Sequence, residues 1–457
     1  MLVRPGVCVS PTSKTWLKFK VGPFTVCSCL SLLHIIQQTF KRAEEIVMAL
    51  SVKHLNADTT FLLTFTPAIA PRHVGANFPG SFTILVDPWL SGPSSIWKPS
   101  FQISHHTTES CIKSLTEIPE PNLIIISQDK PDHCHRETLC SLPATSRVEI
   151  LATPAAEKKI RSWNHFKNAT INLFEPYSPE KHATLFRIPI PGYTSLSPPG
   201  EVTIAYLPAR VDVTKLHNAI GITYRAPSCQ TTAPSGSLIN LFNIPLSPPS
   251  SPEVASRPLS RPRTLSRNRS SALDQRRIST PPDSPMDGQV PTFFSQPARE
   301  KTISVLYSPH GVSPPTVAPY ASTHLAKESA LPLAALLHSV NTEENPWFMG
   351  GVVAAGYPGG AELVRKFGAQ CWISAHDEAK DNRGWSVAFI KSTRYDLDAV
   401  QKKLGEDTAS HEEIGGKQIR KIPGQTKIIN LEPGESIRIP DGLGEHIGRK
   451  QGKRPCV

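Results

Sequence analysis

The sequence lacks a long hydrophobic run. Its nearest approach, residues 21–36, contains Pro23, several small polar residues and His34, whereas a membrane-spanning helix needs about 20 consecutive apolar residues. A protein that spans a membrane is therefore not expected. Cysteine is scarce and unpatterned, because the nine cysteines are scattered and only Cys27 and Cys29 lie close together. Neither a metal-binding spacing nor a disulfide framework is present, and we expect a reducing, intracellular compartment with a cytoplasmic location.

Acidic residues are missing from the start of the chain, where the first is Glu44. This basic segment lacks the ordered regions of a secretory signal. Met48 directly precedes a strand-like run at residues 51–65, so we expect the folded body to begin near Met48. Residues 1–47 are then predicted to be a basic, unstructured extension, with a mitochondrial transit peptide as the alternative.

Aromatic residues are not interleaved with the basic residues in two of the three basic segments of the chain. The 49 Lys and Arg residues exceed the 38 Asp and Glu residues by 11, which invites a nucleic-acid interpretation. However, the excess lies in the first 20 residues, in an arginine-rich central segment and in residues 449–454. We interpret these segments as solvated tails, so no specific nucleic-acid partner is expected.

Lysine is missing from residues 227–299, which contain 13 prolines, eight arginines and many serines. Such a composition does not bury enough apolar surface to offset the entropy of ordering the chain. We predict a disordered insertion. Arginines precede Ser266 and Ser279 at the spacing that basophilic kinases select, and several serines and threonines precede proline, so kinases are candidate partners of the insertion.

The remaining body alternates between strand and helix signals. A helix is predicted after Thr153-Pro154, where an N-cap residue and a proline precede good helix formers, and another over residues 361–367 before Gly368. Short β-branched or apolar runs bounded by Pro, Gly, Asp or Asn predict strands, at residues 61–65, 83–86, 123–126, 148–151, 202–206, 220–224, 302–307 and 370–373.

The most informative stretch is Leu123 to His135, in which an apolar strand ends at Ser127 and opens into a polar loop with Asp132 and His133. Here the chain resembles the metallo-β-lactamase superfamily, in particular its branch of hydrolases that act on lactones and phosphodiesters. In that family a strand ends in Ser/Thr-His-x-His-x-Asp-His. Asp132 and His133 match its last two positions.

Three further segments resemble the same family. Residues 53–63, which include His54, look like its first strand, Asp87-Pro88 matches the end of a second strand, and His376 follows a strand as the family's last metal-binding histidine does. The resemblance implies an α/β fold, a four-layer αββα sandwich of two mixed sheets. Its two halves would be residues 48–226 and 300–398, interrupted by the 227–299 insertion and followed by a C-terminal segment, 399–457, with a basic tail.

The chain also departs from the family. The two histidine positions of His-x-His are Gln128 and Lys130, and Arg210 lies where a third histidine is expected. His310 stands near the position of the acid that bridges two metals. A protonated lysine cannot bind a metal, so the resemblance implies at most one metal, with Lys130 as a fixed positive charge for an anionic substrate group.

These matches yield a specific expectation for the site. We expect one divalent metal, with zinc favoured over iron or manganese, and Asp132 and Lys130 as catalytic residues. The expected ligands are Asp132, His133, His376 and His310, supported from behind by Asp87 and His54. The predicted function is hydrolysis of a small ester, lactone or phosphodiester, and whether the chain is an enzyme stays open. The alternative is a catalytically inactive, metal-free binding or scaffold protein on the same fold.

Two residues beside this stretch have simpler interpretations. Cys134 lies between two histidines, but only that adjacency suggests a nucleophile. His135 falls in the first turn of the helix predicted from Arg136 to Leu142. We expect neither to take part in the chemistry.

Overall fold

A computed structural model describes residues 48–71, 74–228, 230–232, 238–240, 302–409 and 426–439 of the chain. Within these residues no helix is both long and apolar enough to cross a membrane. Two seven-stranded sheets form the body, and each mixes parallel and antiparallel pairs.

The first sheet is built mainly from the N-terminal half of the body. Strands β3, β6, β7 and β8 run parallel, while β1 and β2 form an antiparallel hairpin beside them. In spatial order its strands are β22 (Ser436–Ile439), β1 (Ala49–His54), β2 (Phe61–Thr66), β3 (Phe82–Val86), β6 (Leu123–Ile126), β7 (Glu149–Ala152) and β8 (Thr170–Leu173).

The second sheet combines an antiparallel meander with a parallel part. Strands β9, β10, β11 and β14 pair antiparallel, and β14, β15, β18 and β21 pair in parallel. In spatial order its strands are β21 (Lys427–Ile429), β18 (Ala369–Ser374), β15 (Leu333–His338), β14 (Ile303–Ser308), β11 (Asn218–Arg225), β10 (Gly200–Pro208) and β9 (Leu185–Ile190).

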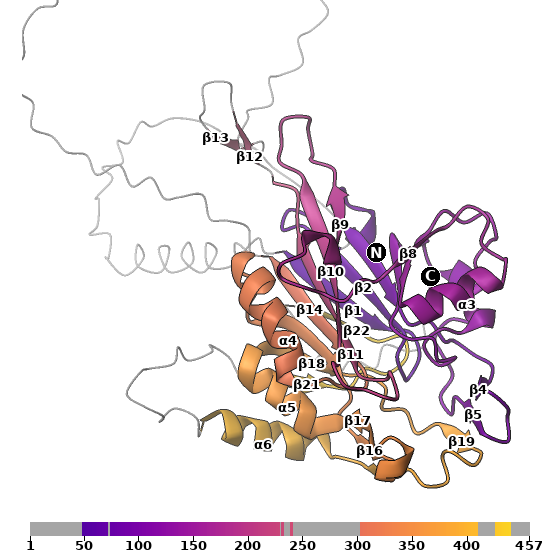
Figure 1. Ribbon diagram of the computed structural model, residues 1–457. Coiled ribbons are helices and arrows are strands. Elements are labelled where there is room, and N and C mark those ends of the chain that lie inside the picture. Colours follow the sequence, from indigo (N-terminus) through magenta and orange to yellow (C-terminus); the bar gives the residue numbers. More distant parts are fainter. Residues whose placement is uncertain are drawn as a thin grey trace, which may run out of the picture. The chain divides into compact units, whose positions relative to one another are not determined.

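Helices cover the outer faces of both sheets, as Figure 1 shows. Buried Ala156 and Ile160 of α3 pack on the first sheet, and α4, α5 and α6 pack on the second. The helices are α2 (Arg136–Leu139), α3 (Pro154–Ser162), α4 (Pro314–Tyr320) continued by the π-turn η5 (Ala321–Leu325), α5 (Gly356–Phe367) and α6 (Leu397–Ala409). The 3-10 turns are η1 (Gly75–Asn77), η2 (Leu115–Glu117), η3 (His182–Thr184) and η6 (Trp347–Met349).

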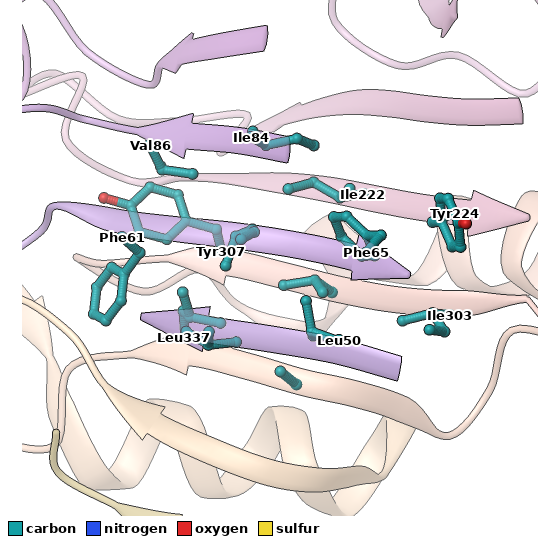
Figure 2. Packing of buried hydrophobic residues seen from close by; sticks show 14 of the residues in the cluster. Leu50, Phe61, Phe65, Ile84, Val86, Ile222, Tyr224, Ile303, Tyr307 and Leu337 are labelled. Carbon is teal, nitrogen blue, oxygen red and sulfur yellow. The ribbon is translucent and has the colours of Figure 1, made fainter. Parts of the chain in front are cut away.

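The main core lies between the two sheets, where side chains from both inner faces meet (Figure 2). Leu50, Phe61 and Phe65 of the first sheet are fully buried with Ile222 and Tyr224 of the second. Each such side chain contributes roughly 1.5–3 kcal/mol when it leaves water. Two further buried clusters lie beneath the helices, which completes the predicted four-layer αββα sandwich.

Three small sheets extend this body. Strands β4 (Ser94–Ile96), β5 (Gln102–His105) and β19 (Asp381–Arg383) form one, and β16 (Thr342–Glu344), β17 (Val352–Ala355) and β20 (Lys391–Thr393) form another. In the third, β12 (Gln230–Thr232) pairs with β13 (Leu238–Asn240) near the start of the segment predicted to be a disordered insertion. Most of that segment, with its candidate kinase sites, lies outside the described residues, as do residues 1–47 and the basic tail.

The second half of the domain extends past the predicted boundary at residue 398. Helix α6 packs on α5 and β21, and β21 and β22 add an edge strand to the second and first sheets respectively. Residues 397–409 and 426–439 are therefore part of the sandwich. The boundary was placed too early because two short strands and one helix carry little signal of their own.

Candidate metal centre

Three histidines follow strands that end at the same edge of the sandwich. His133 lies in the loop after β6, His310 follows β14 and His376 follows β18. Strands β14 and β18 run parallel on either side of β15, and the carboxyl ends of parallel strands meet at one edge of a sheet. Loops at such ends project side chains from a rigid scaffold.

The three imidazoles converge on one another. The His133 and His310 Nε2 atoms are 3.1 Å apart. The ring centroid of His376 lies 5.4 Å from that of His133 and 4.5 Å from that of His310. One ring nitrogen from each lies within 4.8 Å of the others. Three of the four predicted metal ligands are thus brought together.

Each of the three rings is held from behind by an oxygen that contacts its Nδ1 atom. His133 Nδ1 is 2.8 Å from Asp87 Oδ2, and His310 Nδ1 is 2.8 Å from the carbonyl oxygen of Val353. His376 Nδ1 is 3.0 Å from Asp58 Oδ1. An acceptor at Nδ1 favours a proton there and directs Nε2 away from it, as in many metal-ligating histidines. The Nε2 atoms of His133 and His310 lie within hydrogen-bond distance of each other, and either can donate. All three rings are therefore oriented as metal ligands would be.

Asp87 is the most heavily hydrogen-bonded of these acceptors. It accepts from the Ser127 backbone N–H at 2.7 Å, from the Ser127 hydroxyl and from the Tyr307 hydroxyl at 2.7 Å. Tyr307 comes from the second sheet, so Asp87 joins the two sheets beneath His133. Both Asp87 and His376 have positive φ angles, 41° and 66°, which costs a non-glycine residue energy and often marks functional positions.

Asp132, the fourth predicted ligand, is placed beside the cluster. Its Oδ2 lies 4.0 Å from His133 Nε2. Its Oδ1 is buried and has no hydrogen-bond partner among the described residues. Burial would raise the pKa of this carboxyl, but the charges of His133, Lys380 and His376 outweigh it and lower the pKa. Asp132 is therefore an ionised carboxylate with a free oxygen.

The sequence did not point to a buried ion pair beside His376. Lys380 Nζ is 2.9 Å from Asp58 Oδ2 and 3.3 Å from His376 Nδ1, and it also lies 5.7 Å from the centroid of the Trp89 ring. Burial would raise the pKa of Asp58, but the charges of His376 and Lys380 hold it well below its usual value. Only the spacing of Lys380, four residues after His376, could have suggested it.

Lys130 and the other positions that replace family histidines lie differently. The ion contact of Lys130 is with Asp129, 3.7 Å away, and its side chain is 30% exposed. Gln128 is buried and donates to the Leu216 carbonyl at 3.0 Å, and Arg210 is exposed. The buried ammonium at the cluster belongs to Lys380 rather than Lys130, so the catalytic role of Lys130 stays a prediction.

The remaining candidates have structural contacts. His54 contacts the carbonyl oxygens of Leu431 at 2.6 Å and Asp58 at 3.3 Å, so it supports the Asp58 loop rather than a ligand directly. Burial raises the pKa of Cys134 to about 12, so no thiolate forms near neutral pH. The side chain of His135 caps α2 by accepting from the Thr138 N–H.

The donor set fits a divalent metal. Two nitrogens that bind one zinc tetrahedrally at 2.0–2.1 Å lie about 3.3 Å apart, and the His133 and His310 Nε2 atoms are 3.1 Å apart. Burial, followed by the charges of His376 and His133, holds the pKa of His310 well below its usual value. A neutral imidazole keeps the lone pair that a ligand needs. The unpartnered Asp132 Oδ1 adds an acceptor without a donor.

Comparison with known proteins gives matches only among solved structures. No family model matches the chain, and no curated protein does. An isothiocyanate hydrolase from Delia radicum gut bacteria is 11% identical over 85% of this chain and 98% of its own, with a TM-score of 0.40. A possible metal-dependent hydrolase from Veillonella parvula DSM 2008 is 11% identical over 86% and 98%, with a TM-score of 0.40.

A third structure is the metallo-beta-lactamase fold protein YhfI from Bacillus subtilis. It is 9% identical over 86% of this chain and 99% of its own, with a TM-score of 0.35. These are structures to which the chain is similar. The αββα fold and the candidate centre rest on the sheet order and the contacts described above.

Proposed function

We propose that the protein is a metal-dependent hydrolase that acts on a small ester, lactone or phosphodiester. It would use one divalent metal, of which zinc is the favoured candidate. The observation that carries this proposal is the orientation of His133, His310 and His376, each held at Nδ1 by an oxygen. One ring nitrogen of each histidine lies within 4.8 Å of the others, an arrangement that a metal ion explains and that three separate structural roles do not require. The ionised Asp132 completes the donor set.

Each residue around the metal has its own proposed role. A metal at this point would supply Lewis acidity and a means of ionising water near neutral pH. The free Asp132 Oδ1 is placed either to bind the metal or to accept a proton from water. Asp87 and Asp58 hold two of the rings in one tautomer. Lys130 remains the proposed contact for substrate charge.

The alternative, a metal-free binding or scaffold protein, is favoured by one specific observation. The positions of the family's other metal carry Gln128, Lys130 and Arg210, and Gln128 is committed to a backbone carbonyl. A chain that lost one metal could have lost the second as well. The two hypotheses differ in metal content before they differ in activity.

Elemental analysis of the purified full-length protein tests the proposal. We expect about one zinc, iron or manganese per chain, and a higher melting temperature when metal is added. The variant His310→Ala should lose the metal, while His182→Ala, at an exposed histidine, should keep it. Metal below about 0.1 per chain, with no thermal shift, would leave only the scaffold alternative.

Activity is tested on the metal-loaded protein. p-Nitrophenyl acetate, dihydrocoumarin and bis(p-nitrophenyl) phosphate represent the three substrate classes. We expect turnover of at least one, and His310→Ala should abolish it while His182→Ala should not. If the protein binds one metal per chain but turns over none of these substrates, the result would support the metal centre and contradict the hydrolase activity.

A further inference from the structure

A strip of four aromatic rings runs across the small sheet next to the candidate centre. Trp97 follows β4, Phe101 precedes β5, and Trp385 and Phe389 follow β19. The ring centroids are 4.6 Å apart for Trp97 and Phe101, 5.9 Å for Phe101 and Trp385, and 6.2 Å for Trp385 and Phe389. Trp97, Trp385 and Phe389 are 86%, 59% and 50% exposed. We call these four residues the aromatic strip.

A second exposed aromatic pair extends the same end of the sandwich. Strand β20 begins two residues after Phe389 and pairs with β16, which leads to Trp347 and Phe348, 88% and 68% exposed. In the view of Figure 1, β16 and β17 lie at the lower middle of the ribbon and β4, β5 and β19 at its lower right. A soluble monomer rarely exposes several large aromatic residues together without a partner.

The charge around the aromatic strip is positive. Residues 94–102 and 381–394, which carry the strip, have four basic side chains and one acidic, a net charge of +3. Strand β16 beside the second aromatic pair adds Glu343 and Glu344, and the two groups together still carry a net charge of +1. Lys98 follows Trp97 directly, and the one acid, Asp381, is already paired with Arg383 at 2.7 Å. Tryptophan and phenylalanine with Lys and Arg between them are typical of surfaces that lie in the interface of an anionic bilayer.

We propose that the aromatic strip docks on an anionic lipid surface. A second copy of the chain is disfavoured because a two-fold contact would bring like charges together. A single-stranded nucleic acid is disfavoured because one of the four cations, Arg383, is already paired with Asp381. Binding to a phosphate backbone depends on free cations, whereas binding to a bilayer also gains from buried apolar area. In the absence of a membrane-spanning helix among the described residues, such a surface would lie on the bilayer without crossing it.

The location of the strip relates docking to the candidate centre. Strand β19 begins directly after Lys380, and its partner β5 ends at His105, next to His106, which contacts the Trp89 carbonyl and Glu378. Two of the four residues of the aromatic strip, Trp385 and Phe389, therefore lie on the same chain segment as His376. The proposal nevertheless stands on the surface alone and is tested without metal or substrate, so it can fail independently of the proposed hydrolase.

Vesicle co-sedimentation of the full-length protein provides the test. We expect it to pellet with phosphatidylcholine vesicles that contain roughly a quarter phosphatidylglycerol, and less with pure phosphatidylcholine. The double variant W97A/W385A should bind at least about tenfold more weakly, since binding scales with buried apolar area. L196A is the matched control, because Leu196 is 67% exposed on the loop between β9 and β10, and it should bind as the unchanged protein does.

Four outcomes would overturn the proposal. The protein could stay in the supernatant, or W97A/W385A could pellet as well as the unchanged protein, which would assign binding to other basic segments. Self-association without lipid that W97A/W385A abolishes would assign the strip to a second copy. Retention of an oligonucleotide that depends on the strip would assign it to nucleic acid. Equal melting temperatures of all three proteins would show that the fold is intact.

Discussion

At the scale of single residues, the buried pair of Asp58 and Lys380 supports the orientation of His376. Removing one member of a buried ion pair leaves an uncompensated charge and costs roughly 3–5 kcal/mol. We expect K380M to lower the free energy of unfolding by about this amount, measured by urea denaturation. The double variant D58N/K380M should recover much of the loss, because both charges are then absent.

A matched pair on the surface provides the control. Arg383 and Asp381 are 73% and 42% exposed, and an exposed ion pair contributes about 0–1 kcal/mol. R383M should therefore change stability little. Additive losses in D58N and K380M, with no recovery in the double variant, would show that the two charges do not depend on each other.

His338, at the end of β15, gives the folded state a pH dependence. Its Nδ1 is 2.7 Å from the Ser339 carbonyl, and its Nε2 is buried without a partner among the described residues. Burial lowers the pKa of His338 to about 4. The unfolded chain takes up a proton below about pH 6.5 and the folded chain does not, so His338 costs stability as the pH falls from about 6.5 to 4.

The variant H338N isolates this effect. It keeps a donor for the Ser339 carbonyl but does not titrate. As the pH falls from 7 to 4, the free energy of unfolding of H338N should therefore rise relative to that of the unchanged protein by up to about 3 kcal/mol. Urea denaturation across this range measures the difference. The corresponding difference for L196A, at an exposed position whose side chain does not titrate, should stay constant. A difference for H338N that does not change with pH would contradict the assignment.

The sequence pointed to some of these residues and not to others, for a physical reason. His133, His310 and His376 each follow an apolar run that ends in a polar loop, and that pattern is visible without a structure. Asp58 and Lys380 follow no such pattern, and their pairing depends on how two loops from different sheets pack. The sequence suggested Lys130 as a cation of the site and did not point to Lys380, because sequence position does not show where a side chain points; the role of Lys130 stays a prediction.

At the scale of elements, most strands that are rich in β-branched residues were predicted within two residues of their bounds, as for β6 and β14. Strand β15, Leu-Ala-Ala-Leu-Leu-His, was missed because alanine and leucine favour helices. It lies between two parallel strands and is buried throughout, so tertiary packing overrides its intrinsic preference. The predicted helix at residues 361–367 begins earlier, at Gly356. Its first turns contain Gly356, Gly359 and Gly360, and glycine is a poor helix former, so the sequence did not indicate that these turns are helical.

The segment between β11 and β14 can be shortened without separating those strands. Tyr224 and Ile303 are directly paired across the sheet, so a short linker can join them. Replacing residues 229–301 with a Gly/Ser linker should leave the melting temperature unchanged or slightly raised, because loop-closure entropy grows slowly with length. Differential scanning calorimetry measures this.

Removal of a helix is the control for that prediction. Replacing Pro314–Leu325 with the same linker removes buried Val317, Tyr320 and Leu325, and we expect a large loss of stability. A comparable loss from the 229–301 replacement would show that the replaced segment packs on the body.

At the scale of the whole molecule, one short C-terminal segment closes both sheets. Strand β21 extends the second sheet beside β18, and β22 extends the first beside β1. Between them the Leu431 carbonyl contacts His54 Nδ1 at 2.6 Å. Because His54 also contacts the Asp58 backbone, this segment links the sandwich to the loop that orients His376.

Ending the chain after residue 425 should therefore prevent stable folding. It removes buried Ile428, Ile429, Leu431 and Ile439, which together are worth roughly 6–12 kcal/mol, comparable to the total stability of about 5–15 kcal/mol of most proteins. It also exposes β1 and β18 as unpaired edges that favour aggregation. A chain ended after residue 439 keeps both strands and should melt as the full chain does. Circular dichroism and size-exclusion chromatography compare the two, and a shorter chain that stays monomeric with an unchanged melting temperature would show that the two sheets close without these strands.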